Sequence, residues 1–100
     1  MEKKSTYIYF LRLVRPKMAV APTEEERRLI AEHLRYLMQL GEQGVVILAG
    51  PSLEPPRTGI VVFRASSRAE AHEIMDADPA ISGGIMNGIL SAFSLAVMPG

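Results

Sequence analysis

Hydrophobic positions divide the chain into short apolar runs and longer helical stripes. Residues 6–14 are almost continuously aromatic, β-branched or aliphatic over a length too short for a typical helix, which predicts a strand that Pro16 closes. Residues 24–40 carry apolar side chains at helical spacing and charged side chains between them, which predicts an amphipathic helix. The apolar runs 45–49 and 60–65 predict two more strands, joined by a segment rich in proline and glycine.

Capping signals support the two helices that this pattern predicts. Thr23 and Glu26 form a capping box before the first helix, and Ser67 and Glu70 form another before a shorter one. The second helix should end at Asp78-Pro79, because the residue before a proline disfavours helical geometry. Residues 80–88 are rich in glycine and have room for one more helical turn, and residues 89–98 predict a last strand.

The resulting order is strand, helix, strand, strand, helix, strand. It predicts an α+β, ferredoxin-like βαββαβ fold with a four-stranded antiparallel sheet and two helices on one face. We expect a single domain over residues 1–100, with the second strand at a sheet edge. The strands are apolar on both faces, so the face without helices would be a large exposed patch. We therefore expect a homodimer that forms through the sheet faces.

Composition narrows the range of partners and cofactors. Eleven basic and eleven acidic residues give zero formal charge, so no net positive charge favours binding to nucleic acid or to an anionic membrane. The chain has no cysteine, which removes disulfide and thiolate chemistry. It shows no cluster of metal ligands, no phosphate-binding loop, no membrane span and no secretory signal. We expect a cytoplasmic protein with no metal and no cofactor.

The two histidines are the natural candidates for acid–base chemistry near neutral pH. His33 lies on or beside the buried stripe of the first helix, where partial desolvation suits a neutral base. The alternative is a histidine at the edge of the core, bonded to a backbone carbonyl. His72 lies in the first turns of the second helix, where we expect it to be exposed and structural.

Asp76 and Asp78 flank the end of the second predicted helix. A carboxylate at the end of a helix opposes the helix dipole, although Asp-Pro is also an ordinary turn former. The functional alternative is a carboxylate that orients a histidine. In this topology the two helices lie side by side, so His33 and Asp78 can meet although they are far apart in sequence.

Weaker signals come from the residues that follow the first and second predicted strands. Gly50-Pro51, at the end of the second predicted strand, would form a rim of the cleft between His33 and Asp78. Main-chain N–H groups around Gly50 or Ser52 could hold an anionic oxygen, so Gly50, Pro51 and Ser52 are candidate substrate-binding residues. The basic residues at the end of the first strand suit a solvated strand end better than an anion site.

In this order, the short motifs resemble the YciI-like family of the dimeric α/β barrel superfamily. The residues that carry the resemblance are His33-Leu34-Arg35-Tyr36-Leu37, Gly44, Ala49-Gly50-Pro51, Gly59, Ser67 with Glu70-Ala71, and Ala77-Asp78-Pro79. The resemblance implies a ferredoxin-like fold, dimerisation through the sheet faces, and a catalytic His–Asp pair at His33 and Asp78. It also implies lyase-type chemistry, such as the dehydrochlorination of a hydroxylated chloroaromatic.

Three hypotheses follow. The first is a small enzyme of the lyase or isomerase type, in which His33 is the general acid–base and Asp78 orients it, acting on a small organic molecule. The second is a non-catalytic dimeric module that binds a small ligand or has a regulatory role. The third, with the least support, is a purely structural oligomerisation domain. Whether the protein is an enzyme stays open on the sequence alone.

Overall fold

The computed structural model of the protein describes residues 4–97. The elements in chain order are β1 (Ser5–Leu13), the 3₁₀ turn η1 (Pro16–Ala19), α1 (Glu24–Glu42), β2 (Val46–Pro51), β3 (Gly59–Ala65), α2 (Arg68–Asp76), α3 (Pro79–Ser82) and β4 (Met86–Ala92). Residues 1–3, part of the N-terminal segment in which we found no secretory signal, lie outside the described residues. So does Met98, the predicted end of the last strand.

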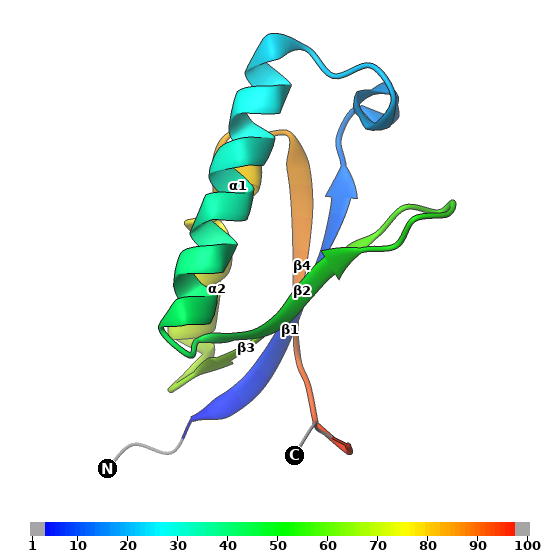
Figure 1. Ribbon diagram of the computed structural model, residues 1–100. Helices are drawn as coiled ribbons and strands as arrows, with labels where there is room; N and C mark the ends of the chain where they lie inside the picture. The colour runs from blue at the N-terminus through cyan, green and yellow to red at the C-terminus, as the bar shows by residue number, and fades with distance from the viewer. Residues whose placement is uncertain (1–3, 98–100) are drawn as a thin grey trace.

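The four strands form one antiparallel sheet in the order β2-β3-β1-β4. The helices lie on one face of this sheet, to the left of the strands in Figure 1, where the long α1 stands in front of α2. The predicted ferredoxin-like arrangement is therefore confirmed, including the place of β2 at a sheet edge. No helix within residues 4–97 is long and apolar enough to cross a membrane.

Alternation along β1 decides which side chains form the core. Tyr9 and Leu11 point to the helix-covered face, where they are buried beside Phe63 of β3. The Tyr9 and Phe63 rings meet edge to face, with their centroids 5.6 Å apart. Ile8 and Phe10 point to the opposite face, which no helix covers.

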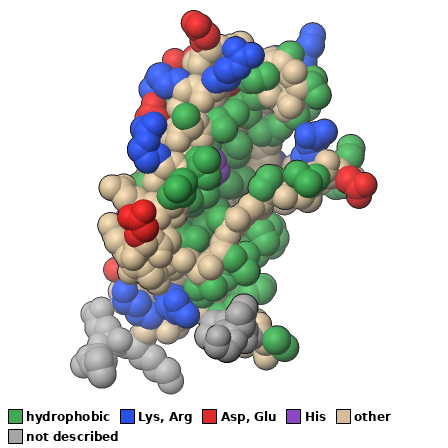
Figure 2. Space-filling model, in the orientation of Figure 1, with side chains coloured by type: hydrophobic (Ala, Val, Ile, Leu, Met, Phe, Trp, Pro, Cys, Tyr) green, Lys and Arg blue, Asp and Glu red, His purple; other side chains and the backbone are tan. Residues whose placement is uncertain are grey.

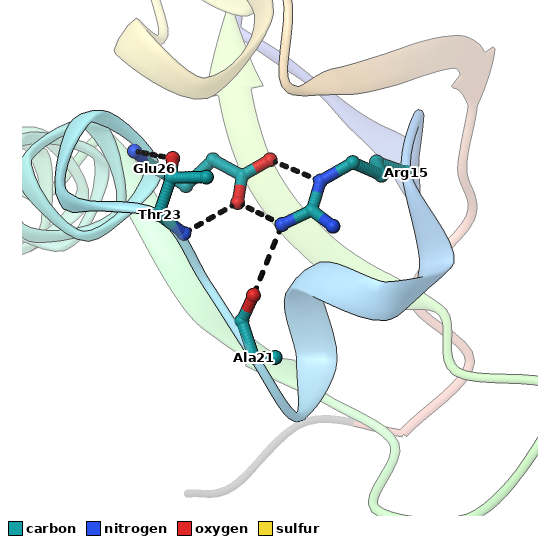
Figure 3. A network of polar contacts seen from close by, with 4 residues as sticks. All are labelled: Arg15, Ala21, Thr23 and Glu26. Atoms are coloured by element: carbon teal, nitrogen blue, oxygen red, sulfur yellow. Dashed lines mark hydrogen bonds and ion pairs between the residues drawn. The ribbon is translucent and has the colours of Figure 1, made fainter.

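The start of α1 is fixed by the predicted capping box and by a contact that we did not predict. Thr23 Oγ1 accepts the Glu26 N–H at 3.1 Å, and Glu26 Oε1 accepts the Thr23 N–H at 2.8 Å. Arg15, just after β1, adds an ion pair by donating from Nε to Glu26 Oε2 at 2.9 Å and also donates to the Ala21 carbonyl (Figure 3). This group ties the end of β1 and the turn η1 to the first turn of α1.

The predicted end of the first helix and both predicted bounds of the last strand were wrong, for identifiable reasons. The helix α1 continues through Gly41 to Glu42, and the chain leaves it at Gly44, which has φ of 77°. The last strand is Met86–Ala92 and not 89–98. It begins opposite Leu13, and its ladder with β1 ends where Ala92 pairs with Tyr7 near the start of that strand.

Gly50-Pro51 does not stop the second strand as predicted. The strand β2 continues through Pro51, which pairs with Gly59 of β3. Proline lacks an N–H, but an edge strand can hold it because one side of the strand has no ladder to maintain. The connection between the two strands is therefore the seven-residue segment 52–58.

Candidate functional site

His33 and Asp78 meet beneath the helices. The Nδ1 atom of His33, on α1, lies 2.6 Å from Oδ1 of Asp78, just before α3. The Asp78 side chain is fully buried, and the His33 side chain is 14% exposed. The partner of this histidine is thus a carboxylate and not a backbone carbonyl, which was the structural alternative for His33.

Two further donors hold Asp78 in place. The Tyr9 hydroxyl donates to Oδ2 at 2.7 Å, and the Ala80 N–H donates to Oδ1 at 2.9 Å. Asp78 is therefore the N-cap of α3, which explains why an acid stands where α2 ends. Because both oxygens are bound, the carboxylate has one fixed orientation toward the imidazole.

Close packing of α3 against α1 brings the carboxylate to the histidine. A Cβ atom on Gly83, at the end of α3, would lie 2.6 Å from a methyl carbon of Leu29 on α1. A side chain there would displace Leu29 and would also lie 2.6 Å from the Pro79 carbonyl oxygen, so glycine suits this close approach. A second link joins α1 to α2, because the Tyr36 hydroxyl donates to the Ile74 carbonyl at 2.6 Å.

The electrostatics of the group fix which atoms donate. Burial, and then the nearby charge of Asp78, raise the pKa of Tyr9 well above its ordinary value, so this tyrosine stays a neutral donor. A carboxylate only accepts, so His33 donates its Nδ1–H to Asp78. In the neutral imidazole this leaves Nε2 with a free lone pair, and Nε2 makes no hydrogen bond within residues 4–97.

His33 lines a cavity of about 640 Å³ between α1 and the β2–β3 hairpin. Leu34 and Met38 of α1, Met18 of η1 and Leu11 of β1 make its surface mainly apolar. Figure 2 shows this hollow as green side chains between the long helix and the projecting hairpin, with histidine in purple inside it. Ligand sites are commonly concave, mostly apolar spaces of roughly 300–1,000 Å³ with a few polar groups.

The predicted substrate-binding residues Gly50, Pro51 and Ser52 all line this cavity. The polar groups of Ser52 are already engaged within the hairpin loop. Its N–H donates to the Thr58 carbonyl at 2.9 Å, and its hydroxyl accepts the Thr58 N–H and donates to the Pro56 carbonyl. Ser52 therefore shapes the loop, and a bound oxyanion would find its N–H already bonded.

Other candidates lie away from the cavity. His72 and Asp76 are exposed on α2, and Arg15 is committed to Glu26. Residues 4–97 contain no group of three or more His, Cys, Asp or Glu side chains placed to hold a metal ion. The chemistry of the described residues is therefore concentrated on His33 and its neighbours.

Sequence reasoning missed two residues of the site. Tyr9 was taken for a strand core residue, although a fully buried tyrosine hydroxyl usually has a hydrogen-bond partner. Arg57 was part of an irregular loop, but it lines the cavity together with His33. Only the alternation of β1 could have drawn attention to Tyr9, and no sequence signal marked Arg57.

The fold and the cavity define a ferredoxin-like α+β protein with an apolar cavity between a helix and an edge hairpin. The model of the YCII-related domain matches residues 8–90, and the chain belongs to this family. The search of curated proteins finds no match.

A solved structure shares the fold. It is 5-chloro-2-hydroxyhydroquinone dehydrochlorinase (TftG) from Burkholderia phenoliruptrix, in complex with 2,5-dihydroxybenzoquinone. The two chains superpose with a TM-score of 0.69 and are 18% identical, over 89% of this chain and 93% of that one.

Proposed function

We propose that the protein is a small enzyme of the lyase or isomerase type, with His33 as its general acid–base and Asp78 as the residue that orients it. The observation that carries the proposal is the 2.6 Å contact between the buried Asp78 and His33, which lines an apolar cavity. The dehydrochlorinase activity of the structural neighbour is consistent with this class of chemistry.

The proposed step begins when His33 Nε2 takes a proton from an acidic C–H or O–H of a bound organic molecule. The electron pair of that bond forms a new double bond. In an elimination, a leaving group departs with its own electron pair; in an isomerisation, the imidazolium returns the proton to another carbon. Asp78 stabilises the imidazolium cation while it exists.

The test is a comparison of His33→Ala with His72→Ala. Halide release from hydroxylated chloroaromatics and deuterium exchange at acidic C–H positions would be followed by NMR. We expect His33→Ala to lose about 10²–10⁴-fold in rate, while His72→Ala keeps the wild-type rate. Equal rates in all three proteins would refute the proposal, provided that the circular dichroism of the variants is unchanged.

A second candidate is a non-catalytic module that binds a small ligand, and the cavity by itself supports it. The two candidates differ in what His33 must do. Ligand binding without any proton exchange, in a protein whose His33 does not titrate by NMR, would favour the binding module.

We further infer that the protein is a homodimer joined through its open sheet face. Phe10, Leu48 and Ile89 point to this face and are 37%, 48% and 66% exposed. Ile8 and Val62, which pair with each other on the same face, are already buried, and a gathering of apolar side chains on an uncovered sheet face is of the kind that marks an interface. Sedimentation equilibrium at micromolar concentration tests this, and a Phe10→Asp variant should shift the protein to monomer.

A further inference from the structure

The ionisable residues that line the cavity are basic, and none of them is acidic. Arg57, in the loop between β2 and β3, and His33 are the ionisable residues among those that line it, and no Asp or Glu is among them. All the other lining residues are apolar or uncharged. A cationic side chain at the mouth of an apolar space favours a ligand with an anionic group.

Arg57 is available to such a ligand. Within residues 4–97 its guanidinium makes no hydrogen bond or ion pair, whereas Arg15 and Arg28 are both paired with glutamates. Arg57 is exposed, so it bears no burial cost before the ligand arrives. A guanidinium can hold a carboxylate through two parallel N–H···O bonds.

The two ionisable residues lie on different walls. His33 belongs to α1, and Arg57 belongs to the loop between β2 and β3. This loop extends past the ends of the two strands, away from α1 (Figure 1). Between them the surface is made of aliphatic and methionine side chains such as Leu34, Met38 and Met18. A ligand that spans the cavity would have an anionic end, an apolar body and a reactive position near Nε2 of His33.

We propose that the substrate class is a small, predominantly apolar organic carboxylate, and that Arg57 is the residue that binds its carboxylate group. This inference rests on the proposed function, because it assigns the ligand of the same cavity. It assigns Arg57 to recognition and leaves the proton transfer to His33 and Asp78.

The experiment compares two probes of equal size and shape, naphthoate and naphthamide, which differ in charge. Dissociation constants would come from NMR titrations of the wild-type protein and of Arg57→Gln. We expect wild type to bind naphthoate about tenfold more tightly than naphthamide, because one hydrogen bond to a charged group strengthens binding by about that factor. The Arg57→Gln variant should bind both probes equally, with the affinity for naphthamide unchanged.

The matched control is Arg27→Gln, which removes an exposed charge from α1 at a position that does not line the cavity. It should keep the preference for naphthoate. Equal affinities in wild type, binding of neither probe, or a preference that survives in Arg57→Gln would overturn the proposal. Proton exchange is measured separately, so a preference for naphthoate without any His33-dependent exchange would refute the enzyme hypothesis but leave the role of Arg57 in binding a carboxylate ligand standing.

Discussion

Two carboxylates anchor α1 to the rest of the fold, and their surroundings differ. Glu26, at the first turn of the helix, is bound by Arg15 and by the N–H of Thr23 (Figure 3). Asp78 precedes α3 and meets the middle of α1 at His33; it is bound by His33, Tyr9 and the N–H of Ala80.

The difference lies in the cation. Arginine is always charged and serves Glu26 as a permanent partner, so that group can only hold the chain together. Histidine gains and loses its proton near neutral pH, and its second nitrogen is free on the side of the cavity. Hydrogen-bond donors surround both carboxylates. The group at Glu26 is purely structural, whereas the group at Asp78 is a candidate catalytic site.

The largest expected effect comes from removing the buried carboxylate. Asp78→Ala leaves the Tyr9 hydroxyl, the His33 Nδ1–H and the Ala80 N–H without their acceptor. We expect a loss of about 3–5 kcal/mol in the free energy of unfolding, measured by urea denaturation. Glu26→Ala should cost less, because water can reach its partner Arg15, whose side chain is 40% exposed. A larger loss for Glu26→Ala would reverse the ranking of the two anchors.

A smaller effect should follow from removing one donor of the Asp78 group. Tyr9→Phe keeps the ring against Phe63 but leaves Oδ2 of Asp78 without its hydrogen bond. We expect a loss of about 1–2 kcal/mol in stability and a lower rate of any His33-dependent proton exchange.

Tyr7→Phe is the control for this variant. Tyr7 lies on the same face of β1, and its hydroxyl makes no hydrogen bond within residues 4–97. Removing the Tyr7 hydroxyl should change the free energy of unfolding by less than about 0.5 kcal/mol. Equal losses in the two variants would show that the bond to Asp78 contributes nothing of its own.

The smallest effect is a pH dependence at the structural anchor. Hydrogen bonds from Arg15, and then from the Thr23 backbone, lower the pKa of Glu26 from 4.5 to about 2. Between these values the unfolded chain binds more protons than the folded one. The stability that Glu26 contributes is therefore complete above pH 4.5 and is lost as the pH falls toward 2.

The Glu26→Gln variant removes this titration. Its unfolding free energy, measured with urea at several pH values across this window, should fall less steeply with decreasing pH than that of wild type. Parallel curves for the two proteins would show that Arg15 does not hold the carboxylate as described.

The sequence was sufficient for the fold because local signals agreed with the long-range pattern. Thr23 and Glu26 marked the start of α1, and the order of apolar runs admitted one topology. The meeting of His33 with Asp78 followed from that topology. The motif resemblance assigned the pair a catalytic role, which stays a prediction.

The parts that could not be predicted depend on contacts between distant segments. Nothing local to Tyr9 shows that its hydroxyl meets a residue 69 positions later. One helical turn was allowed for in the glycine-rich segment 80–88, but the exact place of α3, Pro79–Ser82, depends on its packing against α1. The ion pair of Arg15 was missed for the same reason, since its partner lies beyond the turn η1.

The closed hydrogen bonding of the 52–58 loop has a consequence for how such a protein can diversify. Ser52 bonds to Thr58 and Pro56, so the loop is held by its own groups and by the two strands that carry it. None of its bonds reaches α1, α3 or the Asp78 group. The length and composition of this loop can therefore be exchanged between relatives, or by design, while the His33–Asp78 geometry is inherited unchanged.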